Sequence, residues 1–274
     1  MITTKEKYEQ YKPKKFLGQN FLVDHNIAKK IVVSLEIKPD DVIVEIGPGQ
    51  GVLTKYISEI TNNFIAVEID KSIYEKLAAD YEGRIKLIHK DFLKVDLEND
   101  IPVCNGSSDK KKLKIIGNIP YNITTEILFK LYDSVEIIDS AVLMMQKEVA
   151  KRLTAQPHTK DYGILAIQTQ VHCNPKILFN VPPTAFFPKP NVDSSIVRFD
   201  FQKSKYEIKD KDLFKTLVKQ SFSQRRKTMK NSLKKFFEEN KIDPEKIDFD
   251  FTRRAETISI DEYIRLLNSV IDLK

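Results

Sequence analysis

The chain has 274 residues, of which 41% are hydrophobic and 31% are charged, with 8 glycines and 12 prolines. This composition excludes collagen-like, low-complexity and wholly disordered chains, and the length predicts a main domain of roughly 200 residues with a smaller appendage. The net charge of +6 is modest, so it bears on function only where basic residues cluster.

Neither a metal site nor a membrane segment is expected. Cys104 and Cys173 lie far apart and lack the spacing of metal ligands, which argues against a zinc site or a disulfide scaffold. No apolar stretch approaches the roughly 20 residues that span a bilayer, and the N-terminus lacks the apolar core of a signal peptide. We therefore expect a cytoplasmic protein that binds neither membrane nor metal.

Short apolar runs alternate with helical stretches through the first half of the chain. The runs cover residues 42–46, 64–69, 85–89, 113–117 and 141–146, and the segment 72–81 between two of them has helical spacing of apolar residues. Nearly continuous apolar runs are typical of parallel strands that helices cover on both faces. The alternation predicts a doubly wound α/β domain with a mostly parallel, Rossmann-like sheet.

Two further strand candidates, residues 177–181 and 195–201, follow this region. The proline-rich segment between them is too short for a crossover helix. We expect the two to form an antiparallel pair at one edge, which brings the sheet to seven strands.

The composition shifts at about residue 203. Residues 203–241 contain thirteen Lys or Arg and five Asp or Glu and keep helical periodicity. Ser259 stands three residues before Glu262, which is the spacing of a capping box at the start of a last amphipathic helix. The sequence thus predicts a domain over residues 1–202 and a small, basic helical domain over residues 203–274.

A glycine loop follows the first strand of the sheet. Gly47, Gly49 and Gly51 lie between this strand and a helical stretch, the order found where backbone approaches a nucleotide-like ligand closely. The next strand ends in Glu68 and Asp70, which share a face, and either carboxylate can hold a ribose diol, Glu68 being the better candidate.

The spacing of this loop distinguishes between cofactors. GxGxG differs from the GxGxxG of dinucleotide enzymes, so S-adenosylmethionine fits better than NAD. At the end of the third strand, Asp91 is placed to accept from an adenine amine, with Phe92 or Ile69 beside the ring. Tight turns also need glycines, and Asp91 also suits a helix N-cap, so neither feature is decisive alone.

Asn118-Ile119-Pro120-Tyr121 ends the fourth strand and indicates the reaction. The Asn118 side-chain oxygen and the Ile119 carbonyl are two acceptors that can hold both hydrogens of an adenine amine. Pro120 restricts the backbone, and Tyr121 supplies a face on which an extruded base can stack. Asn and Pro are also common in turns, so the tetrapeptide gains its meaning from the glycine loop and Glu68.

Across nearly its full length the sequence resembles the small-subunit ribosomal RNA adenine dimethyltransferases, the kasugamycin-sensitivity family. The matching segments are residues 15–22 (KFLGQNFL), 45–51, 67–70, 118–121, 143–149, 187–194, 222–228 and 254–256. The resemblance implies dimethylation, from S-adenosylmethionine, of N6 on two adjacent adenosines near the 3′ end of small-subunit rRNA, with a role in ribosome biogenesis. It also implies that the cofactor is contacted by Asn20, Leu22, Gly47, Glu68, Asp91 and Asn118.

Two features concern the RNA partner, which we expect to be small-subunit rRNA in an assembling small ribosomal subunit, bound by a monomer. Arg225, Arg226, Lys227 and Lys230 form a candidate phosphate clamp, although a lysine-rich helix face is often only solvated. Phe186 and Phe187 can either support the target base or pack a rigid loop.

Three other functions stay open at this point. A large-subunit rRNA methylase of the macrolide-resistance type shares the cofactor loop and the N-x-P-Y motif, and the segments 222–228 and 254–256 favour the small-subunit family over it. A ribosome-assembly checkpoint would act mainly by binding. A DNA adenine methylase is disfavoured because that group generally carries D-P-P-Y.

Overall fold

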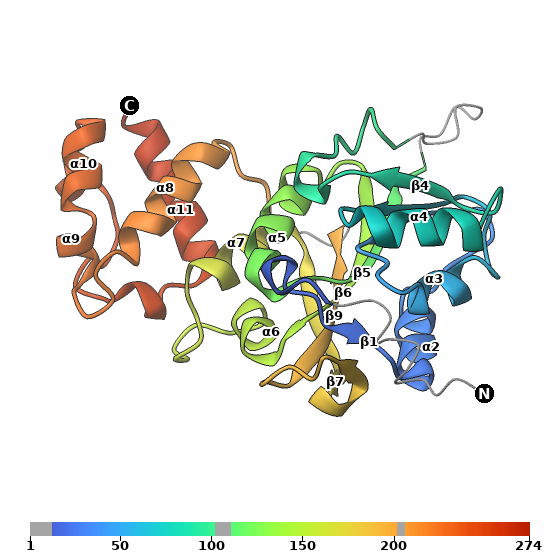
Figure 1. Ribbon diagram of the computed structural model, residues 1–274. Coiled ribbons are helices and arrows are strands. Elements are labelled where there is room, and N and C mark those ends of the chain that lie inside the picture. Colours follow the sequence, from blue (N-terminus) through green and yellow to red (C-terminus); the bar gives the residue numbers. More distant parts are fainter. Residues whose placement is uncertain (1–12, 102–110, 202–205) are drawn as a thin grey trace. The chain divides into compact units, whose positions relative to one another are not determined.

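The computed structural model describes residues 13–101, 111–201 and 206–274 (Figure 1). Cys104 therefore lies outside the described residues. The chain divides into two compact units, one formed by Met1–Ala150 with Asn174–Lys203 and the other by Lys151–Cys173 with Ser204–Lys274.

The first unit is built on a seven-stranded sheet with the strand order β4-β3-β2-β5-β6-β9-β7 (Figure 1). Strands β2 to β6 pair in parallel, whereas β9 is antiparallel to both of its neighbours. The strands are β2 (Val42–Ile46), β3 (Phe64–Glu68), β4 (Lys86–His89), β5 (Leu113–Asn118), β6 (Ile138–Gln146), β7 (Asn174–Val181) and β9 (Ser194–Asp200). This confirms the predicted doubly wound sheet and its antiparallel edge pair.

Helices between the strands cover the sheet because each presents an apolar stripe to it. They are α2 (His25–Ser34), α3 (Val52–Ile57), α4 (Lys71–Asp80) and α5 (Thr124–Asp133). Helix α6 (Lys147–Leu153) spans the division between the two units, which falls after Ala150. Asp24 and Asp70 begin α2 and α4 by accepting hydrogen bonds from the first backbone N–H groups. All five residues of the central strand β2 are buried, and one core cluster joins Ile31 of α2 to Ile43 and Phe64 of the sheet.

A second, two-stranded sheet ties the N-terminal segment to a distant part of the chain. Strand β1 (Phe21–Leu22) pairs antiparallel with β8 (Phe186–Phe187). Phe186 is buried in the core, and Phe187 packs against Phe21, Ile73 and Leu77. The aromatic pair at 186–187 therefore packs a rigid connection, which is the second of the two roles considered above.

The second unit is helical, and it contains a segment that the predicted division placed elsewhere. Its helices are α7 (Ile164–His172), α8 (Lys211–Ser221), α9 (Met229–Ser232), α10 (Lys234–Asn240) and α11 (Ile260–Asp272). Tyr162, Ile167 and Val171 share one buried cluster with Phe214 and Leu267. The predicted division near residue 203 agrees with one observed passage between the units, whereas residues 151–173, which were predicted in the first domain, belong to the second unit because their apolar side chains complete the helical core.

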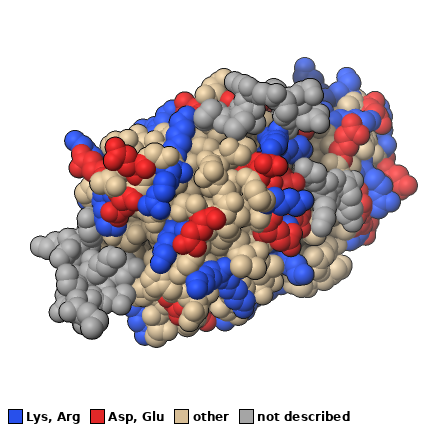
Figure 2. Space-filling view, turned by 90° about the vertical axis from the view of Figure 1, so that its right-hand side faces the viewer, with Lys and Arg blue, Asp and Glu red and all other residues tan. Residues whose placement is uncertain are grey.

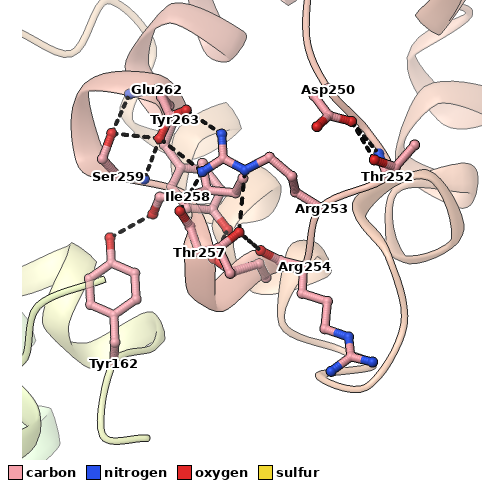
Figure 3. A network of polar contacts seen from close by, with 11 residues as sticks. Tyr162, Asp250, Thr252, Arg253, Arg254, Thr257, Ile258, Ser259, Glu262 and Tyr263 are labelled. Atoms are coloured by element: carbon pink, nitrogen blue, oxygen red, sulfur yellow. Dashed lines mark hydrogen bonds and ion pairs between the residues drawn. The ribbon is translucent and has the colours of Figure 1, made fainter. Parts of the chain in front are cut away.

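Polar contacts at the start of α11 order the loop before it (Figure 3). The predicted capping box between Ser259 and Glu262 is present, and the Arg253 guanidinium donates to Glu262 and to the Thr257 carbonyl. Burial alone would raise the pKa of Glu262, but hydrogen bonds from Arg253 and Ser259 outweigh it and lower that pKa to about 2. Tyr162 joins the network by donating to the Ile258 carbonyl at 3.0 Å.

Candidate functional site

A pocket lies at the carboxyl ends of β2, β3 and β5, where doubly wound sheets bind their ligands. Its lining comes from residues 17–22, from the glycine loop after β2 and from the ends of β3 and β5. Nine of the predicted site residues meet there: Asn20, Leu22, Gly47, Gly49, Glu68, Asn118, Ile119, Pro120 and Tyr121.

The glycine loop leaves space for a ligand beside its backbone. Gly47 has φ +62° and no atom lies within 4 Å of where a Cβ would stand, so the lining is open at this point. Gly49 has φ +55°, and a Cβ there would lie 3.0 Å from the Phe21 ring. Gln50 also lines the pocket, and its buried Nε2 has no hydrogen-bond partner among the described residues. The loop therefore offers an unused buried donor next to open backbone, as a bound polar ligand requires.

Two buried carboxyl groups line the same pocket. The Glu68 side chain accepts from the Asp70 backbone N at 2.8 Å and from the Gly49 backbone N at 3.2 Å. Burial raises the pKa of Glu68 despite these bonds. Burial also raises the pKa of Glu45 to about 8, and the nearby charge of Glu68 adds to this effect. The lining therefore offers carboxyl oxygens that can accept from the hydroxyl groups of a ligand.

Glu68 and Asp70, the two acids considered for a ribose diol, have different positions in the structure, and the role itself stays a prediction. Glu68 lines the pocket, whereas Asp70 begins α4 and pairs with Lys14 at 2.8 Å. Burial alone would raise the pKa of Asp70, but hydrogen bonds from Lys14, Ser72 and Gln19 outweigh it and lower that pKa to about 2. Glu68 is therefore the acid that faces the ligand space.

The Asn118 side chain is held in one orientation at the end of β5. Its Nδ2 donates to the Asn20 carbonyl at 2.8 Å, so its Oδ1 remains as an acceptor in the pocket lining. The Pro120 carbonyl accepts from Ile123 N and Thr124 Oγ1. No described residue donates to the Ile119 carbonyl, so the side-chain oxygen of Asn118 and this carbonyl stand as neighbouring acceptors.

Tyr121 lines the pocket with a ring whose hydroxyl is fixed. The hydroxyl lies 2.6 Å from Ser194 Oγ, and Ser194 itself is fully buried on β9. Burial raises the pKa of the Tyr121 hydroxyl, so the ring stays neutral at physiological pH. The β5 motif is thus braced by the antiparallel strand at the far side of β6.

Asp91 does not line the pocket. Its Oδ1 accepts from the Leu93 backbone N at 3.0 Å and begins a 3₁₀ turn, Phe92–Lys94, as an N-cap residue does. Phe92 is buried, whereas Ile69 lines the pocket and is 47% exposed. Of the two apolar residues considered for the ring, Ile69 has the suitable place, and the role of Asp91 stays a prediction.

The predicted phosphate clamp lies in the second unit and its members differ in their contacts. Arg225 donates to the carbonyls of Lys160 and Tyr162 at 3.0 and 3.2 Å, which ties two loops of this unit together. Arg226, Lys227 and Lys230 are exposed. Arg225 therefore has a structural contact that the sequence did not reveal, while the other three remain open to solvent.

Basic and acidic side chains are interspersed on the face of the molecule shown in Figure 2, and neither kind forms a patch of its own there. Among the described residues no group of His, Cys, Asp and Glu could hold a metal ion. None of the helices in the described ranges is long and apolar enough to cross a membrane.

Together the sheet topology, the open glycine loop, Glu68 and the oriented Asn118 define an S-adenosylmethionine-dependent methyltransferase. The unused donor of Gln50 and the open space at Gly47 fit this cofactor, whose carboxylate and hydroxyls need such partners.

Comparison with known proteins then narrows the class. The sequence profile of the ribosomal RNA adenine dimethylase family matches residues 10–272. The chain is 44% identical over 260 residues to a ribosomal RNA small subunit methyltransferase A of Francisella tularensis, covering 94% of this chain and 97% of that protein. The chain belongs to the ribosomal RNA adenine dimethylase family.

Solved structures support the fold. A dimethyladenosine transferase from Plasmodium falciparum has a TM-score of 0.72 at 24% identity and covers 91% of this chain and 96% of its own. The 23S rRNA methyltransferase ErmE has a TM-score of 0.64 at 22% identity and covers 92% of this chain and 100% of its own.

Proposed function

We propose that the protein transfers methyl groups from S-adenosylmethionine to N6 of two adjacent adenosines near the 3′ end of small-subunit rRNA, forming dimethyladenosines. The pair of acceptors at the end of β5, Asn118 Oδ1 and the Ile119 carbonyl, carries the chemistry of this proposal. The choice of small-subunit rRNA rests on the 44% identity to a relative named for that substrate.

The acceptor pair addresses the main difficulty of the reaction. An adenine amine is a poor nucleophile because its lone pair is delocalised into the ring. Two hydrogen bonds, to Asn118 Oδ1 and to the Ile119 carbonyl, favour a pyramidal nitrogen and aim the lone pair along one direction. Asn118 is neutral, so it does not act as a strong base, and the amine loses its proton after the transfer.

Several pocket residues would hold the cofactor. The backbone at Gly47 and Gly49 approaches it, Glu68 accepts from its ribose hydroxyls, and Asn20 and Leu22 close over it. When bound, S-adenosylmethionine supplies a methyl group on a positively charged sulfur that leaves as a neutral thioether.

Tyr121 would supply the platform for the extruded base. Stacking on an aromatic ring contributes about 1–3 kcal/mol per base, which offsets most of the few kcal/mol that unstacking costs. The contact between Tyr121 and Ser194 keeps the ring from turning, so the platform is preorganised.

We propose that the reaction occurs in the cytoplasm on the assembling small subunit and that a monomer carries it out. In this proposal the rRNA phosphates are contacted by Arg225, Arg226, Lys227 and Lys230.

One experiment tests the proposed substrate and the proposed product together. Labelled S-adenosylmethionine is incubated with the protein and small subunits that lack the modification, and the methylated nucleotides are mapped. We expect two methyl groups on each of two adjacent adenosines. Label in large-subunit RNA instead would favour a methylase of the macrolide-resistance type.

A second arm tests whether methylation or binding is the cellular role. Asn118→Ala removes the side-chain acceptor and should abolish methylation while the protein still binds the subunit. Loss of methylation with intact growth would favour the checkpoint function, in which binding matters more than catalysis.

A further inference from the structure

Asp70 is a buried carboxylate outside the pocket that accepts more hydrogen bonds than a helix cap needs. It is 3% exposed. Its Oδ1 accepts from Ser72 N at 3.1 Å, Ser72 Oγ at 2.8 Å and Lys14 Nζ at 2.8 Å, and its Oδ2 accepts from Gln19 Nε2 at 3.1 Å. The bonds from Ser72 suffice to begin α4, so the bonds to Lys14 and Gln19 require another explanation.

Asp24, which begins α2, provides the comparison. Its side chain accepts from Asn26 N and Ile27 N, both in its own helix, and it is half-buried. Asp70 performs the same capping and in addition binds two side chains that lie more than fifty residues earlier in the sequence.

The two side chains belong to one closed loop of the N-terminal segment. The Lys14 backbone N donates to Gln19 Oε1 at 2.8 Å, so Lys14 and Gln19 are joined to each other as well as to Asp70. A few residues further on, Phe21 and Leu22 pair with β8. The segment between Lys14 and Leu22 is therefore fixed at both ends, by Asp70 at one and by β8 at the other.

The catalytic motif depends on the residue between these two anchors. The Asn20 carbonyl accepts from Asn118 Nδ2 at 2.8 Å, and Asn20 follows Gln19 directly. A displacement of Gln19 moves this carbonyl and releases the Asn118 amide. If the amide turns over, it presents its NH₂ group to an adenine amine that itself offers only hydrogens.

We propose that Asp70 is a positioning residue for methyl transfer. By holding Lys14 and Gln19 it fixes the Asn20 carbonyl, which keeps Asn118 Oδ1 turned toward the adenine N6 and keeps residues 17–22 closed over the cofactor. The part that concerns adenine rests on the proposed function, whereas the part that concerns cofactor binding does not.

The central variant is Asp70→Asn, which separates the two tasks of the carboxylate. An Asn side chain still accepts from Ser72 N through its one oxygen and caps a helix well, but it places its NH₂ group against Gln19 Nε2 and removes the negative charge that pairs with Lys14. We expect a tenfold rise, in order of magnitude, in the Kd of S-adenosylmethionine, measured by equilibrium dialysis without RNA. We expect kcat at saturating cofactor to fall by about tenfold or more, because small displacements of a positioning group are costly.

Two further measurements distinguish positioning from general destabilisation. The side-chain amide resonance of Asn118, assigned by its loss in Asn118→Ala, should shift in Asp70→Asn at a temperature well below the thermal midpoint of that variant, where the fold is intact. Lys14→Met should reproduce most of the loss and Lys14→Arg should restore it. The Asp70→Asn and Lys14→Met changes should not add when combined, since they break the same contact.

Lys71→Met is the matched control, because Lys71 forms an exposed ion pair with Glu75 in the helix that Asp70 begins. It should leave the Kd, kcat and the Asn118 resonance unchanged. The proposal fails if Asp70→Asn keeps the Kd and kcat within about twofold of the parent, or if its losses add fully to those of Lys14→Met. If the parent protein does not methylate small-subunit rRNA, the proposed function fails, and the dialysis and resonance measurements still decide the role of Asp70.

Discussion

Glu45 is the group that should dominate the pH dependence of stability in the first unit. It is 1% exposed on the central strand β2, and its Oε2 accepts from Thr54 Oγ1 at 2.7 Å. Burial, partly offset by this hydrogen bond and reinforced by the charge of Glu68, raises its pKa from 4.5 to about 8. Folded protein therefore keeps a proton at neutral pH that the unfolded chain releases.

The sign of the effect follows from this difference. The stability that Glu45 contributes is complete below pH 4.5 and is lost as the pH rises through about 8. Between these values the free energy of unfolding should fall by about 1.4 kcal/mol per pH unit on account of this group. Glu45→Gln keeps an oxygen for Thr54 and cannot ionise, so its stability relative to the parent should increase by about that amount per unit between pH 5 and pH 8.

Urea unfolding at pH 5, 6, 7 and 8 measures this slope. The chain has no tryptophan, so far-ultraviolet circular dichroism is the suitable signal. Glu126→Gln is the control, because Glu126 is an exposed carboxyl on α5. The reasoning is refuted if the curves of Glu45→Gln and the parent run parallel over this range, or if the difference grows toward acid instead.

Other variants test the loop, the clamp and the platform. Gly49→Ala should weaken cofactor binding at least tenfold, because a Cβ would lie 3.0 Å from the Phe21 ring of the pocket. The control Gly83→Ala has a similar φ of +71° and open space around it, so it should cost only about 1 kcal/mol of stability. Equal cofactor affinities of the two variants would contradict this prediction. Arg226→Ala should reduce the salt dependence of rRNA binding, measured by filter binding, by about one unit at unchanged stability. Arg225→Ala should reduce the salt dependence similarly and should also lower the free energy of unfolding, measured by urea titration, by about 1 kcal/mol through its lost carbonyl contacts. Equal stabilities of the two variants would contradict the structural role of Arg225. Tyr121→Phe should retain most activity because the aromatic ring remains, whereas Tyr121→Ala should lower kcat/KM by about tenfold to a hundredfold. A large loss of activity in Tyr121→Phe would show that the hydroxyl group matters more than the stacking face of the ring.

The sheet was predictable because its signal is local. Most of the strands are largely apolar runs between turn residues, and all seven predicted strands are present. The starts of β6 and β7 were placed three residues late, because Asp139 and Ser140 in one and Asn174 and Lys176 in the other interrupt the apolar pattern. Backbone pairing extends these strands beyond their apolar runs, since Ile138 of β6 pairs with Leu113 of β5 and the first residues of β7 pair with β9.

The sequence contains no local pattern that predicts contacts between segments far apart in the chain. Strands β1 and β8 have two residues each and join parts of the chain about 165 residues apart, so no periodicity reveals them. Arg225 matched a basic motif, yet its carbonyl partners Lys160 and Tyr162 belong to a loop far away in sequence.

Most of the pocket was nevertheless named from motifs, because residues at the carboxyl ends of neighbouring parallel strands must meet. Glu45 and Gln50 were not singled out, although both line the pocket. A signal for Glu45 exists: it is the only charged residue within an otherwise apolar strand, and a charge in such a run is rarely there without a partner or a function.

The way the backbone passes back and forth between the two units limits how the protein can be made and recombined. The chain crosses from one unit to the other three times, after residues 150, 173 and 203. During synthesis β7 and β9 emerge only after α7, so the first unit cannot complete its sheet until part of the second has left the ribosome. A fragment that starts at residue 204 would lack Tyr162, Ile167 and Val171 of its buried cluster, so exchanging the helical unit between relatives requires transplanting two separate stretches of gene.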